Sequence, residues 1–310
     1  MFIYLNKYAG GGRAGRRWLD IESELKEYCP DRNYCISSSD TANLQNEILK
    51  HYRNGERLFV AAGGDGTVNI LLNEIMLLNR EIQDNIIFGA IGLGSSNDFH
   101  KPFSKNSYIS GEIPCKLDRQ HAIRHNIGKV CYSDENCQEQ TQYFLINCSL
   151  GIVAHANYLF NGHDRMIKML KKTVTGGAIW YAGLKSLIKY KNTPCTISFD
   201  NTKIDTNLSN LGVLIKPNFS GNFRYDIEVD PQSDYLAVAL CEDLKMRGRL
   251  NTISSLARGK FRGLPGTHIW QGHSIAIDSK SFMPLEFDGE VVMARDIKII
   301  LIKGGFNVCA

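Results

Sequence analysis

The chain has 310 residues, 43% hydrophobic and 22% charged, enough for a large buried core, and its length favours two domains over one. The formal net charge of +4 is too weak an imbalance to imply a nucleic-acid partner. The sequence has no apolar run of about 18 residues and no signal-like N-terminus. Its nine cysteines form no C-x-x-C pair. We therefore expect a cytoplasmic protein with reduced thiols that does not span a membrane.

Short apolar runs alternate with helical patterns in the first part of the chain. Strands are predicted at residues 2–5, 58–62 and 86–91, and helices at residues 16–28, 40–54 and from residue 67 onward. Alternation of this kind is typical of an open parallel sheet flanked by helices. We therefore predict an α/β domain over residues 1–124.

After residue 124 the pattern changes to short strands separated by turns. They are predicted at residues 127–132, 143–148, 196–199, 211–216, 235–240 and 274–278, with helical insertions near residues 163–191 and 250–259. This pattern predicts an antiparallel β-sandwich or barrel over residues 125–296. A last strand, within residues 297–310, is expected to return to the first domain.

The segment Gly63-Gly64-Asp65-Gly66-Thr67 follows a predicted strand and leads into a predicted helix. Glycines let backbone N–H groups approach phosphate oxygens near a helix N-terminus, where the helix dipole also favours an anion. An acid at this point repels phosphate unless a divalent cation, or a proton to be removed, lies between them. Asp65 is therefore predicted to hold Mg²⁺ or to handle a proton. The alternative is a plain Asp-Gly turn.

A second polar turn, Gly-Leu-Gly-Ser-Ser-Asn-Asp-Phe at residues 92–99, follows the next apolar strand. Because the carboxyl ends of parallel strands meet at one edge of a sheet, we expect the two turns to share a ligand site. Short donors and acceptors for phosphate or ribose are supplied by Ser95, Ser96, Asn97 and Asp98. An ordinary Asx turn is the alternative for Asn97 and Asp98.

Three motifs, GGDGT at residues 63–67, GLGSSNDF at 92–99 and FDGE at 287–290, occur in this order. Together they resemble the diacylglycerol kinase catalytic-domain family, which also includes sphingosine and ceramide kinases and bacterial lipid kinases. The loop that begins at Asn6 is similar to the family's N-P-x-S-G loop. The chain departs from the family at Asn126, where the family has Asp, and in the glycine-rich region at residues 220–224. The segment at residues 233–237 is a reduced form of one that can hold a structural metal.

The resemblance implies an ATP- and Mg²⁺-dependent lipid kinase that binds its nucleotide in domain 1–124, in a cleft shared with a β-rich lipid-substrate domain. Diacylglycerol or a related long-chain alcohol is the expected acceptor. The residues assigned to the nucleotide phosphates are Asn6, Gly10, Gly63, Gly64, Gly66 and Thr67, with Ser95 and Asn97 completing the pocket. The catalytic residues are Asp65, Asp288 and Glu290, and the candidate metal ligands are Asp65, Asp230 and Asp234. Glu290 is the favoured base for the acceptor hydroxyl, with a solvated turn as the alternative for residues 288–290.

A lipid acceptor implies contact with a membrane surface, and residues 165–172 mix basic and apolar side chains as an interfacial helix does. Lys185, Lys189 and Lys191 extend the positive charge. A solvated amphipathic helix packed on the domain is the alternative. We expect a cytoplasmic, peripherally membrane-associated enzyme whose partners are ATP and lipid, with no nucleic acid; a homodimer is compatible with this view.

Two other functions compete with the lipid kinase. NAD kinases share the GGDGT motif and a β-rich second domain, but the GSSND turn and the late DGE motif speak against this assignment. A catalytically inactive, nucleotide-responsive lipid-binding regulator is suggested by Asn126 and the altered glycine segments, whereas the presence of Asp65, Asp288 and Glu290 favours an enzyme.

Overall fold

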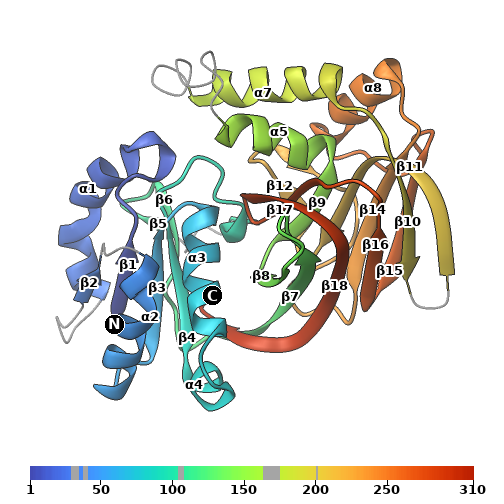
Figure 1. Cartoon of the computed structure of the whole chain (residues 1–310). Helices are drawn as coiled ribbons and strands as arrows, with labels where there is room; N and C mark the ends of the chain where they lie inside the picture. Colours follow the sequence, from blue (N-terminus) through green and yellow to red (C-terminus); the bar gives the residue numbers. More distant parts are fainter. Residues whose placement is uncertain (29–34, 38–40, 104–107, 163–174, 200–201) are drawn as a thin grey trace. The chain divides into compact units, whose positions relative to one another are not determined.

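The chain forms two compact units (Figure 1). The computed structural model describes residues 1–28, 35–37, 41–103, 108–162, 175–199 and 202–310. Unit 1 comprises residues 1–125 and 304–310, and unit 2 comprises residues 126–303. The predicted boundary after residue 124 lies next to this division. The expected return strand is shorter than predicted, because residues 297–300 pair within unit 2 and the return begins at residue 304.

A parallel sheet forms the centre of unit 1 (Figure 1). Its strands are β1 (Phe2–Leu5), β2 (Cys35–Ser37), β3 (Leu58–Gly63) and β4 (Ile87–Gly92), in the order β2-β1-β3-β4, and the end of β18 (Glu290–Val308) pairs in parallel with β4. Nearly all residues of β1, β3 and β4 are buried, as in strands covered on both faces. The strand order reverses between β1 and β3, so their carboxyl ends lie at a topological switch point, where open α/β sheets bind ligands.

Helices with one apolar face cover the sheet of unit 1. The elements around it are η1 (Ala9–Gly11), α1 (Arg13–Tyr28), α2 (Thr41–Arg53), α3 (Asp65–Met76), α4 (Arg80–Asn85), η2 (Asp98–His100), β5 (Tyr108–Ile109) and β6 (Ile113–Lys116). On α1 the buried Trp18, Ile21 and Leu25 recur at helical spacing and pack in one cluster with Val60 and Ile91 of the sheet. The apolar face of α3 is buried in the same way, and α3 contacts β3 and α2.

Unit 2 is built on a closed ring of antiparallel strands. Around the ring these are β11 (Thr202–Leu214), β10 (Thr193–Phe199), β16 (Ser274–Asp278), β18, β17 (Met283–Phe287) and β9 (Asn147–Gly151), which pairs back with β11. Further strands are β7 (Ile123–Ser133), β8 (Glu139–Phe144), β12 (Asn218–Phe219), β13 (Phe223–Arg224), β14 (Leu236–Glu242) and β15 (Thr267–Gly272). Side chains such as Leu150, Leu211, Ile277 and Leu285 form the core of unit 2. The α/β fold with a second, β-barrel part is therefore confirmed.

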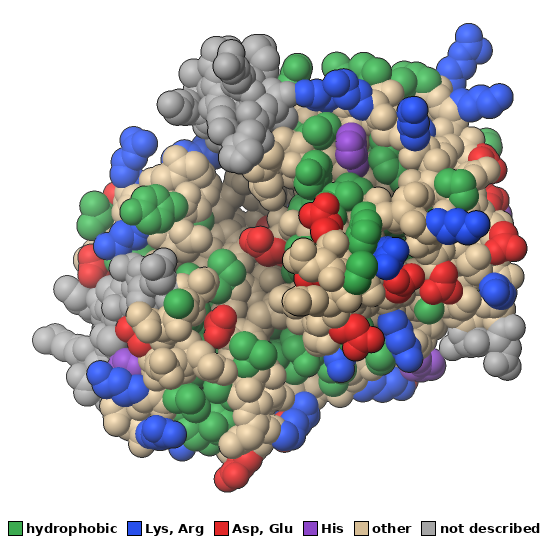
Figure 2. All heavy atoms as spheres, in the orientation of Figure 1, with side chains coloured by type: hydrophobic (Ala, Val, Ile, Leu, Met, Phe, Trp, Pro, Cys, Tyr) green, Lys and Arg blue, Asp and Glu red, His purple; other side chains and the backbone are tan. Residues whose placement is uncertain are grey.

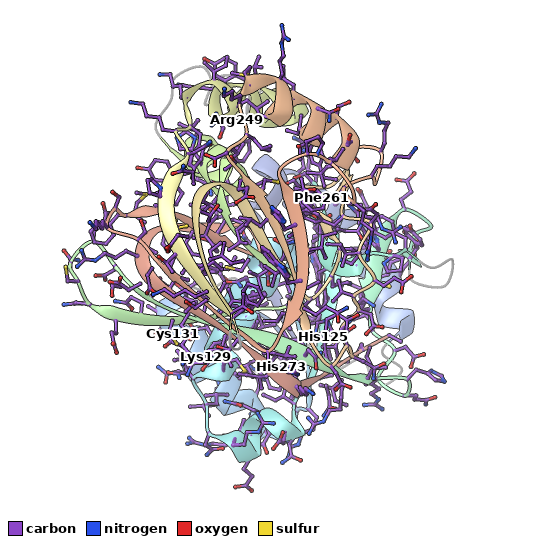
Figure 3. The ribbon with its side chains drawn as sticks, turned by 90° about the vertical axis from the view of Figure 1, so that its right-hand side faces the viewer. His125, Lys129, Cys131, Arg249, Phe261 and His273 are labelled. Atoms are coloured by element: carbon purple, nitrogen blue, oxygen red, sulfur yellow. The ribbon has the colours of Figure 1, made fainter. Side chains whose placement is uncertain are left out.

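In the part of unit 2 that the structure describes, the helices α5 (Ile152–Asn161), α7 (Thr175–Lys189) and α8 (Met246–Leu256) form a layer. α5 packs on β9 and β17, and α7 packs on both α5 and α8. Figure 2 shows hydrophobic side chains exposed beside lysines and arginines over α7 and α8. Arg249 of α8, labelled in Figure 3, donates from Nη1 to the carbonyls of Leu187 and Tyr190, both at 2.8 Å. These bonds fasten the end of α7 to α8.

Three local predictions need correction. The strand predicted at residues 143–148 is two strands, β8 and β9, with a turn at residues 145–146 between them. The helix predicted from residue 67 begins two residues earlier, because α3 starts at Asp65 and Gly64 is its N-cap. Helices α4 and α5 were not predicted. The predicted interfacial segment at residues 165–172 lies outside the described residues.

Candidate functional site

Three loops of unit 1 meet at the carboxyl ends of β1, β3 and β4. The backbone N–H groups of Leu93 and Gly94 both donate to the carbonyl of Gly63, at 2.8 and 3.1 Å. Asn6, which follows β1, donates from Nδ2 to Oγ1 of Thr67 at 3.2 Å. The structure therefore brings residues of all three predicted loops together at the switch point of the sheet.

The glycines in these loops are required by close approach of the backbones. A Cβ atom on Gly94 would lie 2.5 Å from the Cα of Gly64, and one on Gly63 would lie 2.2 Å from Oγ1 of Thr67. Gly10 has a φ of +61°, a conformation that disfavours other residues. The loops can pack this tightly only without side chains, which also leaves their backbone free of steric cover for an anion.

Asp65 joins the loop after β3 to the loop after β4. Its Oδ2 accepts the N–H of Asp98 at 3.1 Å and its Oδ1 accepts the N–H of Phe99 at 3.0 Å. It is also the first residue of α3, where the helix dipole stabilises a negative charge. A carboxylate oxygen that accepts a backbone N–H group can also ligate a cation. The acid in the glycine turn therefore has a structural role that the sequence did not reveal.

Asn97 uses its side chain within its own loop. Its Oδ1 accepts the N–H of Gly94 at 3.1 Å, and its Nδ2 donates to the carbonyl of Gly92 at 3.0 Å. The residue is buried and has a φ of +50°, which Asn tolerates better than most residues. This favours the Asx-type alternative over direct nucleotide binding by Asn97. Ser95, in contrast, is exposed.

Two arginines that the sequence reasoning did not single out touch the same loops. Arg13 donates from Nε to the carbonyl of Gly10 at 2.9 Å, and Arg17 donates from Nη1 to the carbonyl of Gly94 at 3.2 Å. Both lie in the first turns of α1 and are exposed. The cluster RAGRRW directly after the first glycine turn was the available signal, because guanidinium groups suit phosphate recognition.

In unit 2, Asp288 and Glu290 do not share an environment. Asp288 is buried, with 3% of its side chain exposed, and its carboxylate accepts the backbone N–H groups of Leu145, Ile146 and Asn147 at 2.6, 2.9 and 3.1 Å. The bonds of Asp288 hold the turn between β8 and β9, which favours a structural role; its catalytic role stays a prediction.

Glu290 is the first residue of β18 and keeps its side chain in contact with solvent. Surrounding protein atoms nevertheless desolvate the carboxylate in part and raise the pKa of Glu290 above its ordinary value of 4.5. A carboxylate with a raised pKa is a stronger base than an ordinary glutamate. The geometry is therefore compatible with the role predicted for Glu290.

The segment at residues 230–234 does not fit the metal site expected there. Oδ1 of Asp230 accepts the N–H of Gln232 at 2.7 Å, and Asp234 forms an ion pair with Lys303, with Nζ 2.9 Å from Oδ1. The bond from Lys303 lowers the pKa of Asp234. Asn126, in place of the family's Asp, donates from Nδ2 to the carbonyl of Ser233 at 2.6 Å.

Amide and ammonium donors therefore hold this segment. A divalent cation in proteins needs several oxygen ligands. In the described part of the chain, no group of three or more His, Cys, Asp or Glu side chains could bind a metal ion. The contacts of Asp230 and Asp234 thus give no support to the predicted metal ligands. Asp65 differs, because an ion carried by a nucleotide phosphate needs only one or two protein carboxylates.

Comparison with known proteins agrees with the motifs. Residues 1–130 match the family model described as "Diacylglycerol kinase catalytic domain". A diacylglycerol kinase of Staphylococcus haemolyticus is 26% identical over 255 residues, covering 81% of this chain and 70% of the relative. One of Staphylococcus epidermidis is 27% identical over 236 residues, covering 75% of this chain and 67% of the relative.

The fold is found in solved structures as well. A proposed diacylglycerol kinase of Bacillus anthracis has a TM-score of 0.73 at 18% identity, covering 99% of this chain and 94% of that chain. The fold of the chain is therefore that of this solved structure. The match over residues 1–130 and the named relatives support a lipid kinase. Residues 1–130 thus match the diacylglycerol kinase catalytic domain, and the relatives of the chain carry the name diacylglycerol kinase.

We expect Asp65→Asn to destabilise unit 1. The amide nitrogen of the new side chain would face one of the two backbone N–H donors and could not accept its hydrogen bond. Loss of this partly buried bond costs about 1–3 kcal/mol. Thermal unfolding of the full chain measures the effect, with Asp20→Asn on the exposed face of α1 as the matched control. Equal melting temperatures for Asp65→Asn and wild type would show that the two loops are held together by other contacts.

We expect the segment at residues 230–234 to keep its order without divalent cations. Hydrogen exchange of its amides in the nucleotide-free protein should not change when EDTA replaces Mg²⁺, because Asn126 and Lys303 supply the cationic and donor groups. Asn126→Ala should speed exchange there, while the exposed Asn207→Ala on β11 should not. Slower exchange in wild type on addition of Mg²⁺ would overturn this view.

Proposed function

We propose that this lipid kinase transfers the γ-phosphoryl group of ATP to a lipid hydroxyl, with diacylglycerol or a related long-chain alcohol as acceptor. The observation that carries the proposal is the convergence of the three glycine loops around Asp65 at the switch point of the sheet. The names of the Staphylococcus relatives support the acceptor.

Unit 1 binds the nucleotide phosphates. Backbone N–H groups of the tightly packed loops are the donors. A side chain would keep the phosphate from the backbone, which explains why residues 10, 63, 64 and 66 are glycines. Asn6 and Thr67 order these loops through their mutual bond. Ser95 is exposed and offers a hydroxyl, whereas Asn97 acts through the shape of its loop. Arg13 and Arg17 add positive charge beside the glycine loops.

The carboxylate of Asp65 would hold the Mg²⁺ ion that accompanies the nucleotide, because Mg²⁺ is usually bound by one or two carboxylates together with the substrate phosphates. The ion, when bound, neutralises charge on the phosphate oxygens as the phosphoryl group leaves. The two amide bonds of Asp65 fix the direction of its carboxylate before any ligand arrives. Preorganised charge of this kind lowers the barrier because it need not reorient during the reaction.

Glu290 accepts the proton of the acceptor hydroxyl. Its raised pKa increases its proton affinity, and its exposure lets a lipid hydroxyl reach it. Asp288 supports this role through backbone bonds.

The helices α7 and α8 form the face of unit 2 that contacts the membrane. Leu184 and Ile188 of α7 are 54% and 62% exposed, and Leu250 of α8 is 46% exposed. Lys189 and Arg247 are exposed on the same helices. Apolar side chains beside cationic ones fit the interface of an anionic bilayer. Among the described helices, none combines the length and apolar character needed to cross a bilayer.

The first test follows labelled phosphate from γ-labelled ATP to a panel of dispersed diacylglycerol, sphingoid base, ceramide, polyprenol and soluble NAD. We expect a labelled lipid with wild type and a loss of about 10²–10⁴-fold in kcat with Glu290→Gln, because the general base is removed. The wild-type rate should fall as the pH falls through the raised pKa of Glu290, since only the deprotonated form accepts a proton.

Glu139→Gln on β8, another exposed glutamate of unit 2, is the matched control and should keep full activity. Labelled NADP would identify an NAD kinase instead. Binding of ATP without any labelled product would identify a regulatory protein. An unchanged rate with Glu290→Gln would remove the base from the mechanism while leaving the lipid kinase in place.

We expect Ile188→Glu to weaken binding to phosphatidylserine-containing vesicles by at least about threefold, because it replaces exposed apolar surface with an anion. Sedimentation of the protein with vesicles measures the bound fraction. Leu77→Glu, at a position of unit 1 that is 66% exposed, is the control for added charge. Equal loss with both variants would point to net charge and not to the α7 face.

A further inference from the structure

Glu286 is a buried carboxylate that the proposed reaction has not used. It lies in β17 with 4% of its side chain exposed. Its neighbours in the strand, Leu285 and Phe287, belong to the apolar core of unit 2, so Glu286 points to the opposite face of β17, the face on which α5 packs. Burying a carboxylate is costly unless hydrogen bonds compensate for the lost water.

The partners of Glu286 lie on two different elements. Ser149, directly opposite on β9, donates its hydroxyl to Oε2, and the backbone N–H of Gly289 donates to Oε1 at 2.7 Å. The second bond crosses from the strand to the turn that follows it. One carboxylate thus connects the barrel wall to the backbone N–H of Gly289, the residue that immediately precedes Glu290.

This turn is the connection between β17 and β18. Phe287 and Glu290 are paired across the hairpin, and the two residues between them, Asp288 and Gly289, have φ values of +48° and +94°. A two-residue hairpin turn with two positive φ values holds its flanking residues in one register. The carboxylate of Asp288 anchors the turn to residues 145–147, and Glu286 anchors it through Gly289.

We propose that Glu286 is a positioning residue for phosphoryl transfer: its buried carboxylate fixes the Gly289 peptide and thereby the direction in which Glu290 is presented. The inference rests on the proposed function of Glu290 as the base. It gives a use to each acid of the sequence Glu-Phe-Asp-Gly-Glu, with two acids building the turn and the third projecting from it. A misplacement of about 1 Å at a reacting group can cost on the order of 10²-fold in rate.

The test uses the full chain with ATP and vesicle-dispersed diacylglycerol. Glu286→Ala should lower kcat by about 10- to 100-fold with little change in the KM for ATP. Glu286→Gln should recover most of this loss, because the amide oxygen can still accept the N–H of Gly289. Hydrogen exchange should show a faster amide at Gly289 in the alanine variant and a protected one in the glutamine variant.

A double-mutant cycle with Glu290→Gln separates positioning from general loss of stability. If Glu286 acts through Glu290, then Glu286→Ala should cost far less in the Glu290→Gln background than in wild type. Equal costs in the two backgrounds, or a KM effect without a kcat effect, would overturn the proposal. If wild type itself transfers no phosphate to lipid, the proposed function fails first and the inference fails with it. If wild type is active and Glu290→Gln has the same rate, then the roles of Glu290 as base and of Glu286 as its positioning residue are both overturned, while the lipid kinase assignment stands.

Discussion

The two hydrogen bonds that Asp65 accepts from Asp98 and Phe99 constrain the whole glycine site. They connect loops that follow different strands, and glycines then allow these loops to touch backbone to backbone. A single carboxylate therefore shapes the loops and is also the proposed ligand of a cation. Because the same oxygens serve both purposes, any change at this position alters shape and charge together. Structural and catalytic contributions of Asp65 must accordingly be separated by measuring stability and turnover on the same variants.

Much of the fold could be predicted from the sequence, because apolar runs and helical spacing are local signals. The parallel sheet of unit 1 and the change to antiparallel strands in unit 2 both follow from such patterns. The split of residues 143–148 into two strands could not be predicted, since it depends on Asp288, which lies more than a hundred residues later. A run of apolar residues does not indicate where a carboxylate distant in sequence will accept hydrogen bonds from its backbone N–H groups and so interrupt the strand.

The residues of the candidate site could be predicted better than their roles. Glycines next to strand ends predicted that the glycine loops meet at one edge of the sheet, and the structure brings the loops together there. A single sequence does not show backbone φ values or burial. It therefore could not show that Asn97 bonds within its own loop, or that Asp288 is buried while Glu290 is exposed. Arg13, Arg17 and Glu286 were not singled out because each acts through a backbone atom of another segment. Contacts with a backbone atom of another segment cannot be predicted from the spacing of residue types in the sequence.

Asn126 and Lys303 stand at the two ends of unit 2, and both bond to the segment at residues 230–234. The entry and exit of this unit are therefore held near each other by contacts within the unit itself. Inserting a segment into a domain costs conformational entropy, because the two ends of the segment must be brought together. A segment whose own contacts hold its ends together adds little to this cost for the domain that carries it. Unit 2 is therefore organised as a domain that can be transferred to another chain. It is a barrel inserted in the sequence of an α/β domain, and after the insertion the chain pairs in parallel with β4.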